Sequence, residues 1–203
     1  MHAKGVVHRD LKLENVLLNN LGRIKLCDFG VSTCLRTDSD GNPKNLMDCC
    51  GTPAYMAPEV IEVGEQKKKL NQQIKDGVKK KNQIKIHGYT QECDIWSAGV
   101  LLYTMIYGTM PFRGITVREI KEKILAGKYI LKDSVSKEAR DLIKGMLQQD
   151  PEDRPTIQEI LEDPWFDDMP KQEDVTIFDQ NERTMMIKEY LFTENPDKWE
   201  VCI

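Results

Sequence analysis

The chain has 203 residues, of which 40% are hydrophobic and 31% charged, and its formal net charge is −4. This length and composition are typical of one globular domain, or of one domain with a tail. No stretch approaches the roughly 18 consecutive apolar residues of a membrane span, and residues 1–5 lack the apolar region of a signal peptide. The six cysteines form no Cys-x-x-Cys pair and do not cluster with the three histidines, so we expect reduced thiols, no zinc site and a cytoplasmic or nuclear location.

The first segments predict short strands. Residues 23–27 alternate polar and apolar side chains, and residues 19–22 before them have turn chemistry. With residues 16–18 as the partner strand, they predict a small hairpin. The next segment, 31–55, is polar and has no helical or strand period, and so long a loop within a domain is usually functional or disordered.

From residue 94 onward the pattern is helical. Residues 95–107 are apolar nearly all round, which predicts a buried helix that ends at Gly108. Amphipathic patterns predict further helices over 116–126 and 136–148. Two capping boxes predict a helix that starts at Thr156 and a tail helix near 180–192. The expected fold class is therefore α+β and predominantly helical.

Five short motifs follow one another along the chain, and their order and spacing are more informative than any one of them. They are His8-Arg9-Asp10-Leu11-Lys12-Leu13-Glu14-Asn15, Asp28-Phe29-Gly30, Ala57-Pro58-Glu59, Asp94-Ile95-Trp96-Ser97-Ala98-Gly99 and Asp153-Arg154-Pro155. Together they resemble the signature of the protein-kinase family. The resemblance covers residues 1–166 and implies the C-terminal lobe of the kinase fold, with a short β-hairpin at the catalytic loop (residues 8–15), followed by a tail over 167–203.

The chemistry of the family explains the residue types, because phosphoryl transfer needs positioning and charge neutralisation more than covalent chemistry. The resemblance implies that Asp10 accepts the proton of the substrate hydroxyl, that Lys12 neutralises charge on the transferring phosphate, and that Thr52 orients the hydroxyl. Asn15 and Asp28 would hold Mg²⁺, which prefers hard oxygen ligands. The expected cofactors are ATP and Mg²⁺, and the expected partner is a protein substrate, with no nucleic acid.

Other motif residues are structural by the same resemblance. Glu59 and Arg154 would form a buried ion pair that braces the helical lobe, and Asp94 would cap the catalytic loop. The resemblance also implies that the rings of His8 and Phe29 stack in the column of side chains that links the two lobes. Leu17 would lie beneath the adenine ring of ATP.

The catalytic loop also indicates the subclass. Lys12, with Gly51-Thr52-Pro53 farther on, is similar to serine/threonine kinases rather than to tyrosine kinases. Glu14 resembles the acid with which some basophilic kinases hold an arginine of the substrate, so we expect basic residues near the target hydroxyl. The pattern as a whole, including Pro164-Trp165-Phe166, is similar to the calcium/calmodulin-dependent-kinase-like group.

Arg9 needs a negative partner. Kinases with arginine before the catalytic aspartate usually carry a phosphorylated threonine in the activation loop. By resemblance, Asp48 occupies the position of that threonine here. Asp48 is then either a fixed negative charge that replaces the phosphate or a solvated aspartate of the loop with no such role. Thr33, Thr37 and Ser39 remain alternative phosphorylation sites.

The sequence departs from the family at its start. It contains no Gly-x-Gly-x-x-Gly and no lysine in a Val-Ala-Ile-Lys context, so we expect the N-terminal lobe and half of the nucleotide site to be absent. The first expectation is therefore a fragment, inactive alone, of an active serine/threonine kinase. The alternative is a kinase-derived, non-catalytic interaction module or pseudokinase. The presence of Asp10, Asn15 and Asp28 argues against this alternative.

A second departure is a basic insertion near residues 64–86, which lengthens the stretch between Glu59 and Asp94 to 35 residues. Residues 62–88 carry eight lysines and three acids, and Leu70, Ile74 and Val78 are spaced four apart. This pattern is compatible with binding to calmodulin, to an acidic partner or to a membrane surface. A solvated, mobile insertion without a partner is the simpler expectation.

Overall fold

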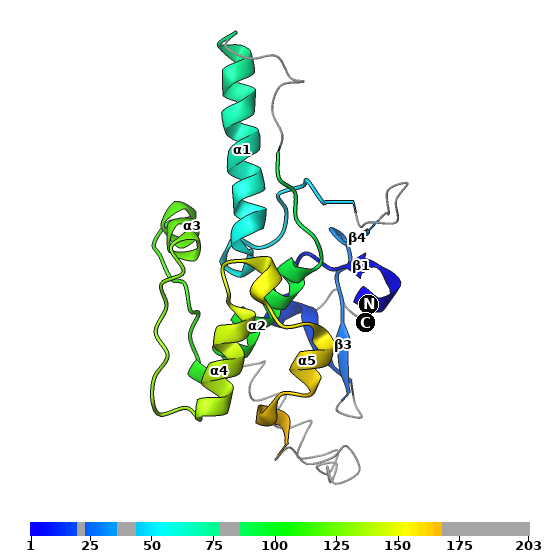
Figure 1. Cartoon of the computed structure of the whole chain (residues 1–203), viewed down its shortest axis with the longest axis vertical. Helices are drawn as coiled ribbons and strands as arrows, with labels where there is room; N and C mark the ends of the chain where they lie inside the picture. The colour runs from blue at the N-terminus through cyan, green and yellow to red at the C-terminus, as the bar shows by residue number, and fades with distance from the viewer. Residues whose placement is uncertain (20–22, 36–43, 78–85, 168–203) are drawn as a thin grey trace, which may run out of the picture. The chain divides into compact units, whose positions relative to one another are not determined.

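The computed structural model describes residues 1–19, 23–35, 44–77 and 86–167 (Figure 1). Contacts divide the chain into two compact units, one of Met1–Val16 and Leu26–Asp168 and the other of Leu17–Lys25 and Met169–Ile203. The tail helix expected near 180–192 lies outside the described residues.

A two-stranded antiparallel sheet belongs to the first unit. β1 (Val6–Val7) pairs with β4 (Thr33–Cys34), with Val6 opposite Cys34 and Val7 opposite Thr33. Val7 is fully buried. The sequence predicts no strand within residues 31–55, and β4 shows that this prediction is wrong, because a two-residue strand is too short to show an alternating pattern.

β2 (Val16–Leu18) and β3 (Ile24–Leu26) are hydrogen-bonded neighbours in a second small sheet. The Asn19 N–H donates to the Arg23 carbonyl at 3.0 Å, and the Arg23 N–H donates to Asn19 Oδ1 at 2.8 Å. Apolar side chains of these strands are exposed, Ile24 to 65%. Turn hydrogen bonds, rather than a buried face, therefore fix the register of these strands.

The rest of the first unit is helical (Figure 1). Its α-helices are α1 (Pro58–Lys75), α2 (Glu92–Tyr107), α3 (Val117–Leu125), α4 (Lys137–Met146) and α5 (Ile157–Leu161). Single 3₁₀ turns lie at His2–Lys4, Leu13–Asn15, Pro53–Tyr55, Pro151–Asp153 and Pro164–Phe166. None of the helices in the described part of the chain is both long enough and apolar enough to cross a membrane. The chain is thus mostly helical with few strands, as the sequence predicts.

α2 lies at the centre of the core. Trp96 is fully buried, and its ring stacks on Phe112 with 5.6 Å between the centroids. α4 packs so closely on α2 that a Cβ added to Gly99 would lie 2.8 Å from the Cβ of Met146. Gly108 ends the helix in the left-handed conformation, with φ 67°. The prediction of a buried helix that ends at Gly108 is confirmed.

The three later helices begin at capping side chains. Thr116 and Ser136 each accept a hydrogen bond from the backbone N–H three residues farther on. Thr156 and Glu159 form the reciprocal capping box that the sequence predicts. Caps of this kind satisfy N–H groups that have no partner within the helix, and each stabilises the helix by about 1 kcal/mol.

α1 continues into the basic insertion. Its first turns are buried through Val60, Ile61 and Val63, whereas the lysines of its later turns are half-buried or exposed. The sequence predicts a solvated, mobile stretch from residue 64, but the helix runs on to Lys75. A helix that packing has nucleated extends readily through good helix formers, and residues 64–75 are rich in Glu, Gln and Lys and contain no proline. Val78 lies outside the described residues.

Arg154 joins α1 to the segments around it. Its guanidinium pairs with both carboxylate oxygens of Glu59, at 2.7 and 2.8 Å, and the Arg154 side chain is fully buried while that of Glu59 is 13% exposed. The same group donates to the carbonyls of Glu92, Gln148 and Gln149. Every N–H of this buried guanidinium therefore has an acceptor.

Arg154→Leu should lower the free energy of unfolding of the full chain by about 3–5 kcal/mol, because it leaves the buried Glu59 carboxylate without its counter-charge. Urea unfolding followed by tryptophan fluorescence measures this loss. Arg118→Leu is the matched control, since Arg118 and Glu122 pair with side chains that are 88% and 59% exposed, and its midpoint should stay at the native value. Equal losses in the two variants would contradict a bracing role, and Glu59→Gln gives the same comparison if Arg154→Leu does not fold.

Candidate active site

The Asp10 carboxylate lies at the centre of a three-residue cluster. Its Oδ2 is 2.9 Å from the Lys12 ammonium, and its Oδ1 accepts the Thr52 backbone N–H at 2.7 Å. Lys12 also donates to the Thr52 hydroxyl at 3.1 Å. A carboxylate, an ammonium and a hydroxyl thus meet from two segments that are 40 residues apart in the sequence.

These contacts keep Asp10 ionised. Burial by itself raises the pKa of Asp10, but the hydrogen bonds from Lys12 and Thr52 outweigh it and hold the pKa below its ordinary value. The hydrogen bond to Asp10 raises the pKa of Lys12. At neutral pH the pair is a carboxylate beside an ammonium, which is the ionisation that a general base with an adjacent positive charge requires.

The cluster depends on a close backbone approach at Gly51. Gly51 has φ 100°, a conformation that residues with a side chain rarely adopt. A Cβ at this position would lie 2.4 Å from the Arg9 carbonyl oxygen. The two segments can pass this closely only because residue 51 is glycine, and the crossing places Thr52 against Asp10.

Asn15 and Asp28 come from adjoining backbone segments, since the Cys27 N–H donates to the Asn15 carbonyl at 3.0 Å. Asn15 is 5% exposed, and its amide nitrogen donates to the Asp10 carbonyl at 3.0 Å, which leaves its Oδ1 as an acceptor. Asp28 is exposed, and one of its oxygens accepts the Gly30 N–H at 3.3 Å. Asp28 also has φ 61°, in the left-handed region that aspartate adopts more readily than most residues with a side chain.

An amide oxygen and a carboxylate suit Mg²⁺, which prefers hard oxygen ligands and completes its shell with phosphate oxygens and water. Across residues 1–19, 23–35, 44–77 and 86–167, no three His, Cys, Asp or Glu side chains gather into a metal site. Asn15 and Asp28 together offer one amide oxygen and one carboxylate.

Asp94 holds the catalytic loop from the first turn of α2. It is 1% exposed, and its two oxygens accept the backbone N–H groups of His8 and Arg9, each at 2.8 Å. The His2 Nε2 lies 2.8 Å from the same carboxylate. Arg9 has φ 67°, a conformation that costs a residue with a side chain about 1–3 kcal/mol, and the hydrogen bonds to Asp94 help to offset that cost.

His8 and Phe29 contact each other, with 4.9 Å between the ring centroids. His8 is fully buried, its Nε2 lies 3.1 Å from the Cys27 carbonyl, and its own carbonyl accepts the Ser32 hydroxyl at 3.2 Å. Phe29 is 50% exposed. The segment that carries Asp28 is thereby fastened to the catalytic loop.

Two further residues that the sequence singles out are exposed. Glu14 lies in the 3₁₀ turn Leu13–Asn15, and its charge adds to the effect of Asp10 in raising the pKa of Lys12. Leu17 lies in β2 and is 43% exposed. β2 continues into the second unit, and the role of Leu17 beneath adenine stays a prediction.

Arg9 and Lys67 both face Asp48. Arg9 Nη1 is 3.6 Å from one oxygen of the Asp48 carboxylate, and Lys67 Nζ is 3.8 Å from the other. The Asp48 side chain is 74% exposed, so water and salt screen both pairs. The backbone is held more firmly, because the Tyr89 hydroxyl donates to the Asp48 carbonyl at 2.5 Å. Burial raises the pKa of Tyr89, which keeps the phenol a neutral donor.

The alternative phosphorylation sites have different surroundings. Thr33 is half-buried in β4, opposite Val7. Thr37 and Ser39 lie outside the described residues.

Three contacts of this site are not predicted by the sequence: those of His2, Lys67 and Tyr89. Lys67 belongs to the insertion, so its place beside Asp48 follows only once α1 is known to continue. His2 and Tyr89 lie in no motif. The one local signal is Gly88, where an added Cβ would lie 2.5 Å from the Leu46 carbonyl, next to the backbone bridge between Leu46 and Tyr89.

Lys12→Met should raise the pKa of Asp10, because it removes a hydrogen bond and a positive charge that lower it. Since the folded-state pKa of Asp10 is below its unfolded value, its contacts stabilise the chain above about pH 4, and this stabilisation is lost as the pH falls through the folded-state pKa. A ¹³C NMR titration of the aspartate carboxyl groups measures the change. Lys137→Met, which removes the partner of Asp141, should leave the titration of Asp10 as it is; identical Asp10 titrations in the native and Lys12→Met chains would refute the coupling.

Comparison with known proteins agrees with the site. Residues 1–166 match the family model of the protein kinase domain. The chain is 41% identical over 165 residues to the SNF1-related protein kinase catalytic subunit alpha KIN12 of Arabidopsis thaliana, covering 81% of this chain and 28% of that protein. It is 38% identical over 168 residues to the probable serine/threonine-protein kinase CCRP1 of Zea mays, covering 82% and 23%, and 38% identical over 165 residues to the SNF1-like protein kinase ssp2 of Schizosaccharomyces pombe, covering 81% and 24%.

The chain thus spans about a quarter of the length of these relatives. The family model includes the catalytic loop, the Gly51 crossing, Asp94 and Arg154. With about four fifths of its residues inside that model, the chain belongs to the family of protein kinase domains.

Proposed function

We propose that the chain carries the catalytic loop of an ATP-dependent protein kinase that phosphorylates serine and threonine, and that it forms the C-terminal lobe of the kinase fold. The observation that carries this proposal is the contact of Asp10 with Lys12 and Thr52. The hydrogen bond from Asn15 to the Asp10 carbonyl links the same loop to the pair that suits Mg²⁺. The names of two of the relatives, as serine/threonine or SNF1-related kinases, support the same activity.

Asp10 is the group that would take the proton of the attacking hydroxyl. Its side chain is 11% exposed, and each oxygen already accepts one hydrogen bond, from Thr52 or Lys12. Each oxygen keeps a further lone-pair site for the substrate hydroxyl. The lowered pKa makes Asp10 a weak base, which is sufficient for a loose transition state in which positioning matters more than covalent chemistry.

Lys12 would neutralise negative charge during the transfer. Its ammonium is held by Asp10 and Thr52 before any substrate arrives, and charge that is already in place needs no reorganisation at the moment of reaction. Bound MgATP supplies the phosphoryl group, and Asn15 and Asp28 would hold the ion. The residues of this chain thus position the hydroxyl, accept its proton and balance the charge.

Substrate preference and subgroup belong to the same proposal. The Lys12–Thr52 contact supports serine and threonine as targets, since it places a hydroxyl and an ammonium beside the base. Glu14 is exposed in the 3₁₀ turn that directly follows Lys12, where an arginine of the substrate could pair with it. We also propose that the chain belongs to the calcium/calmodulin-dependent-kinase-like group, on the motif pattern as a whole, which includes Pro164-Trp165-Phe166.

Asp10→Asn should lower kcat by about 10²–10⁴-fold, because it removes the base, and should change the KM for ATP little, because Asn15 and Asp28 remain. The protein is given an affinity tag in the organism that makes it and is purified from those cells. The assay measures transfer from radiolabelled ATP to a peptide whose serine is flanked by arginine. Asp167→Asn, at an exposed position outside the motifs, is the control and should keep native activity. Native transfer by Asp10→Asn would sink the catalytic role. Transfer by the protein purified from cells but not by the 203-residue chain alone would fit a kinase fragment that is inactive by itself, and no transfer by either would favour a non-catalytic interaction module.

We also propose that Asp48 acts as a fixed counter-charge for Arg9. Arg9 is anchored on two other sides, since its backbone N–H donates to Asp94 and its Nε donates to the Val31 carbonyl at 2.6 Å. The 3.6 Å contact with Asp48 adds the activation loop to this set. A carboxylate has one negative charge where phosphate has up to two, so its ordering effect is the weaker of the two.

Asp48→Ala should lower activity by about two- to five-fold, the rate equivalent of an exposed ion pair worth up to about 1 kcal/mol. Asp48→Glu should keep most of the activity, because it keeps the charge. Both are measured after phosphatase treatment, so that phosphate on Thr33, Thr37 or Ser39 makes no contribution. Native activity in Asp48→Ala would indicate a solvated loop aspartate instead.

A further inference from the structure

α1 and α3 enclose a concave surface whose lining includes none of Asp10, Lys12 and Thr52. Two adjoining hollows lie there, of about 550 and 320 Å³, and both are lined by Glu65, Lys68 and Lys121. The larger one extends to the first turn of α3, and the smaller one reaches Cys49 in the activation loop. We call this surface the α1–α3 groove, defined by Glu65, Lys68, Lys69, Val117, Arg118, Lys121 and Glu122.

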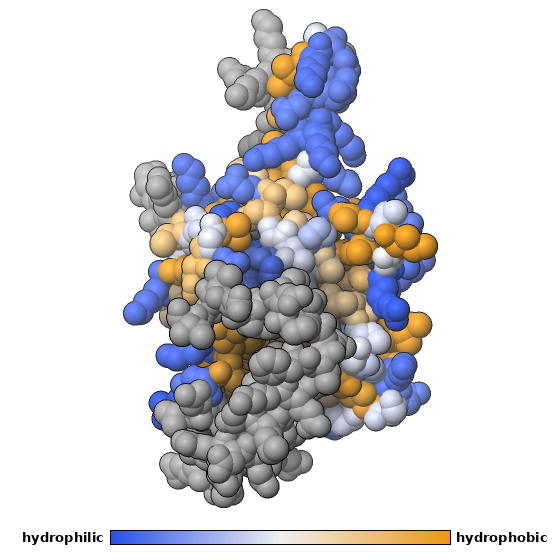
Figure 2. Space-filling view, turned by 180° about the vertical axis from the view of Figure 1, so that it is seen from behind, coloured by the Kyte–Doolittle hydropathy of each residue, from blue (hydrophilic) through white to orange (hydrophobic). Residues whose placement is uncertain are grey.

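The groove has an excess of positive charge. Arg118 is neutralised by Glu122 at 2.8 Å, and Glu65 is the other carboxylate of the lining. Lys68, Lys69 and Lys121 take part in no ion pair within the described ranges. Figure 2 shows hydrophilic side chains gathered over the outer part of α1. Three lysines without a carboxylate partner therefore gather along one hollow, and this excess of positive charge favours an anionic occupant.

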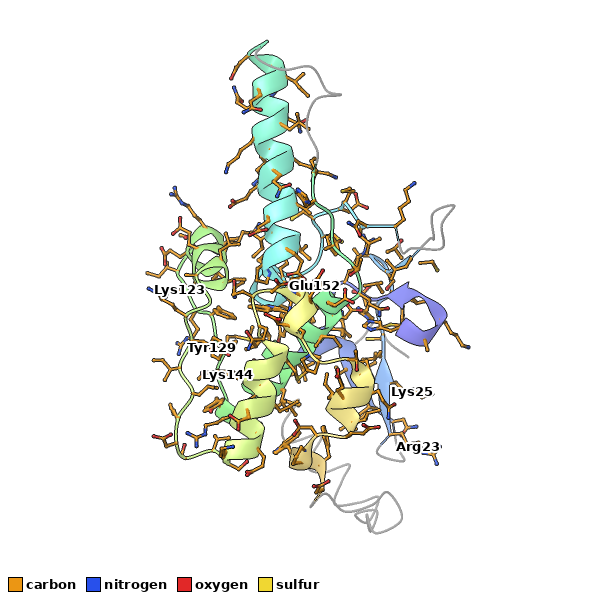
Figure 3. All side chains as sticks on the ribbon, in the orientation of Figure 1. Arg23, Lys25, Lys123, Tyr129, Lys144 and Glu152 are labelled. Atoms are coloured by element: carbon orange, nitrogen blue, oxygen red, sulfur yellow. The ribbon has the colours of Figure 1, made fainter. Side chains whose placement is uncertain are left out.

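Not every cation of α3 belongs to this surface. Lys123, labelled in Figure 3, donates to the Arg113 carbonyl at 2.6 Å. Lys144, also labelled, lies on α4 and is exposed. The uncompensated cations of the groove are therefore a local set, and exposed lysines elsewhere provide matched controls.

An apolar patch adjoins the basic set. Val117 lines the groove and is 51% exposed, and Ile115 just before α3 is 97% exposed. A surface of this kind offers charge pairing along its length and burial of an apolar side chain at one end. An acidic peptide with one apolar residue matches both properties.

We propose that the α1–α3 groove binds an acidic peptide segment of a protein partner, with carboxylates on Lys68, Lys69 and Lys121 and an apolar residue on Val117. The concave shape between two helices favours an extended chain over a flat bilayer. Neither hollow is lined by an aromatic side chain, so there is no platform on which a nucleic-acid base could stack. This binding is separate from phosphoryl transfer.

The groove also adjoins the activation loop. A Cβ added to Gly64 would lie 2.7 Å from the Cys49 sulfur, and Lys67 pairs with Asp48 one turn farther along α1. A segment bound in the groove would therefore lie next to the stretch that leads to Thr52.

The test is the fluorescence anisotropy of a fluorescein-labelled peptide, Glu-Asp-Glu-Leu-Glu-Asp-Glu, titrated with the full chain at low and at physiological salt. The double variant Lys68→Glu, Lys121→Glu should bind it about ten-fold more weakly, since two favourable pairs become repulsive. The control Lys132→Glu, Lys144→Glu makes the same change of net charge at exposed positions outside the groove and should bind like the native chain. Equal weakening in both would overturn the proposal, as would a native chain that does not bind the peptide.

Three further comparisons sharpen the result. Asp10→Asn should bind the peptide like the native chain, which keeps this test independent of catalysis. Replacing the leucine of the peptide by serine should weaken binding to the native chain but not to Val117→Ser. Phosphatidylserine vesicles or single-stranded DNA that bind as tightly as the peptide would overturn the proposal in favour of a general anion surface, and thermal unfolding shows that each variant is folded.

Discussion

The Asp94 carboxylate joins the catalytic loop to the buried helix α2, and the candidate active site depends on this contact. Both oxygens accept backbone N–H groups, those of His8 and Arg9, at 2.8 Å. Because α2 is packed through Trp96 into the core, the loop is anchored to the buried interior of the unit. Arg9 is thereby held in a left-handed conformation, with its carbonyl against Gly51, and the next residue is Asp10.

The same crossing explains how the site balances its charges. Gly51 allows the two segments to pass, Thr52 then donates its N–H to Asp10, and Lys12 reaches both. A carboxylate that is partly buried would otherwise take up a proton more readily, and its two donors prevent this. The catalytic loop and the loop that carries Thr52 are therefore coupled at Asp10. A change in the position of either loop should alter the pKa of Asp10.

Much of the site could be predicted from the sequence because its motifs resemble those of the protein kinase family in residue type, order and spacing. Asp10, Lys12 and Thr52 belong to these motifs, and the structure brings them together. Capping at Thr156 is predictable for another reason: both partners lie within three residues. Contacts of this kind need no knowledge of how the chain returns on itself.

The rest depends on long-range geometry. The pairing of β1 with β4 involves two residues in each strand, too few for a pattern. Lys67 meets Asp48 only because α1 continues beyond its buried first turns, and helix propensity alone is a weak guide to where a helix ends. The α1–α3 groove follows from the same continuation, since lysines that the sequence leaves in solvent are aligned beside α3.

In the proposed function, Asn15 and Asp28 would hold the ion of MgATP beside the Asp10 cluster. Electron paramagnetic resonance with Mn²⁺ as the probe, on protein purified from its own cells, tests it most directly. We predict that ATP increases Mn²⁺ binding by the native protein and that the double variant Asn15→Ala, Asp28→Asn loses this increase. Equal ATP-dependent binding of Mn²⁺ by the native protein and the double variant would contradict the claim.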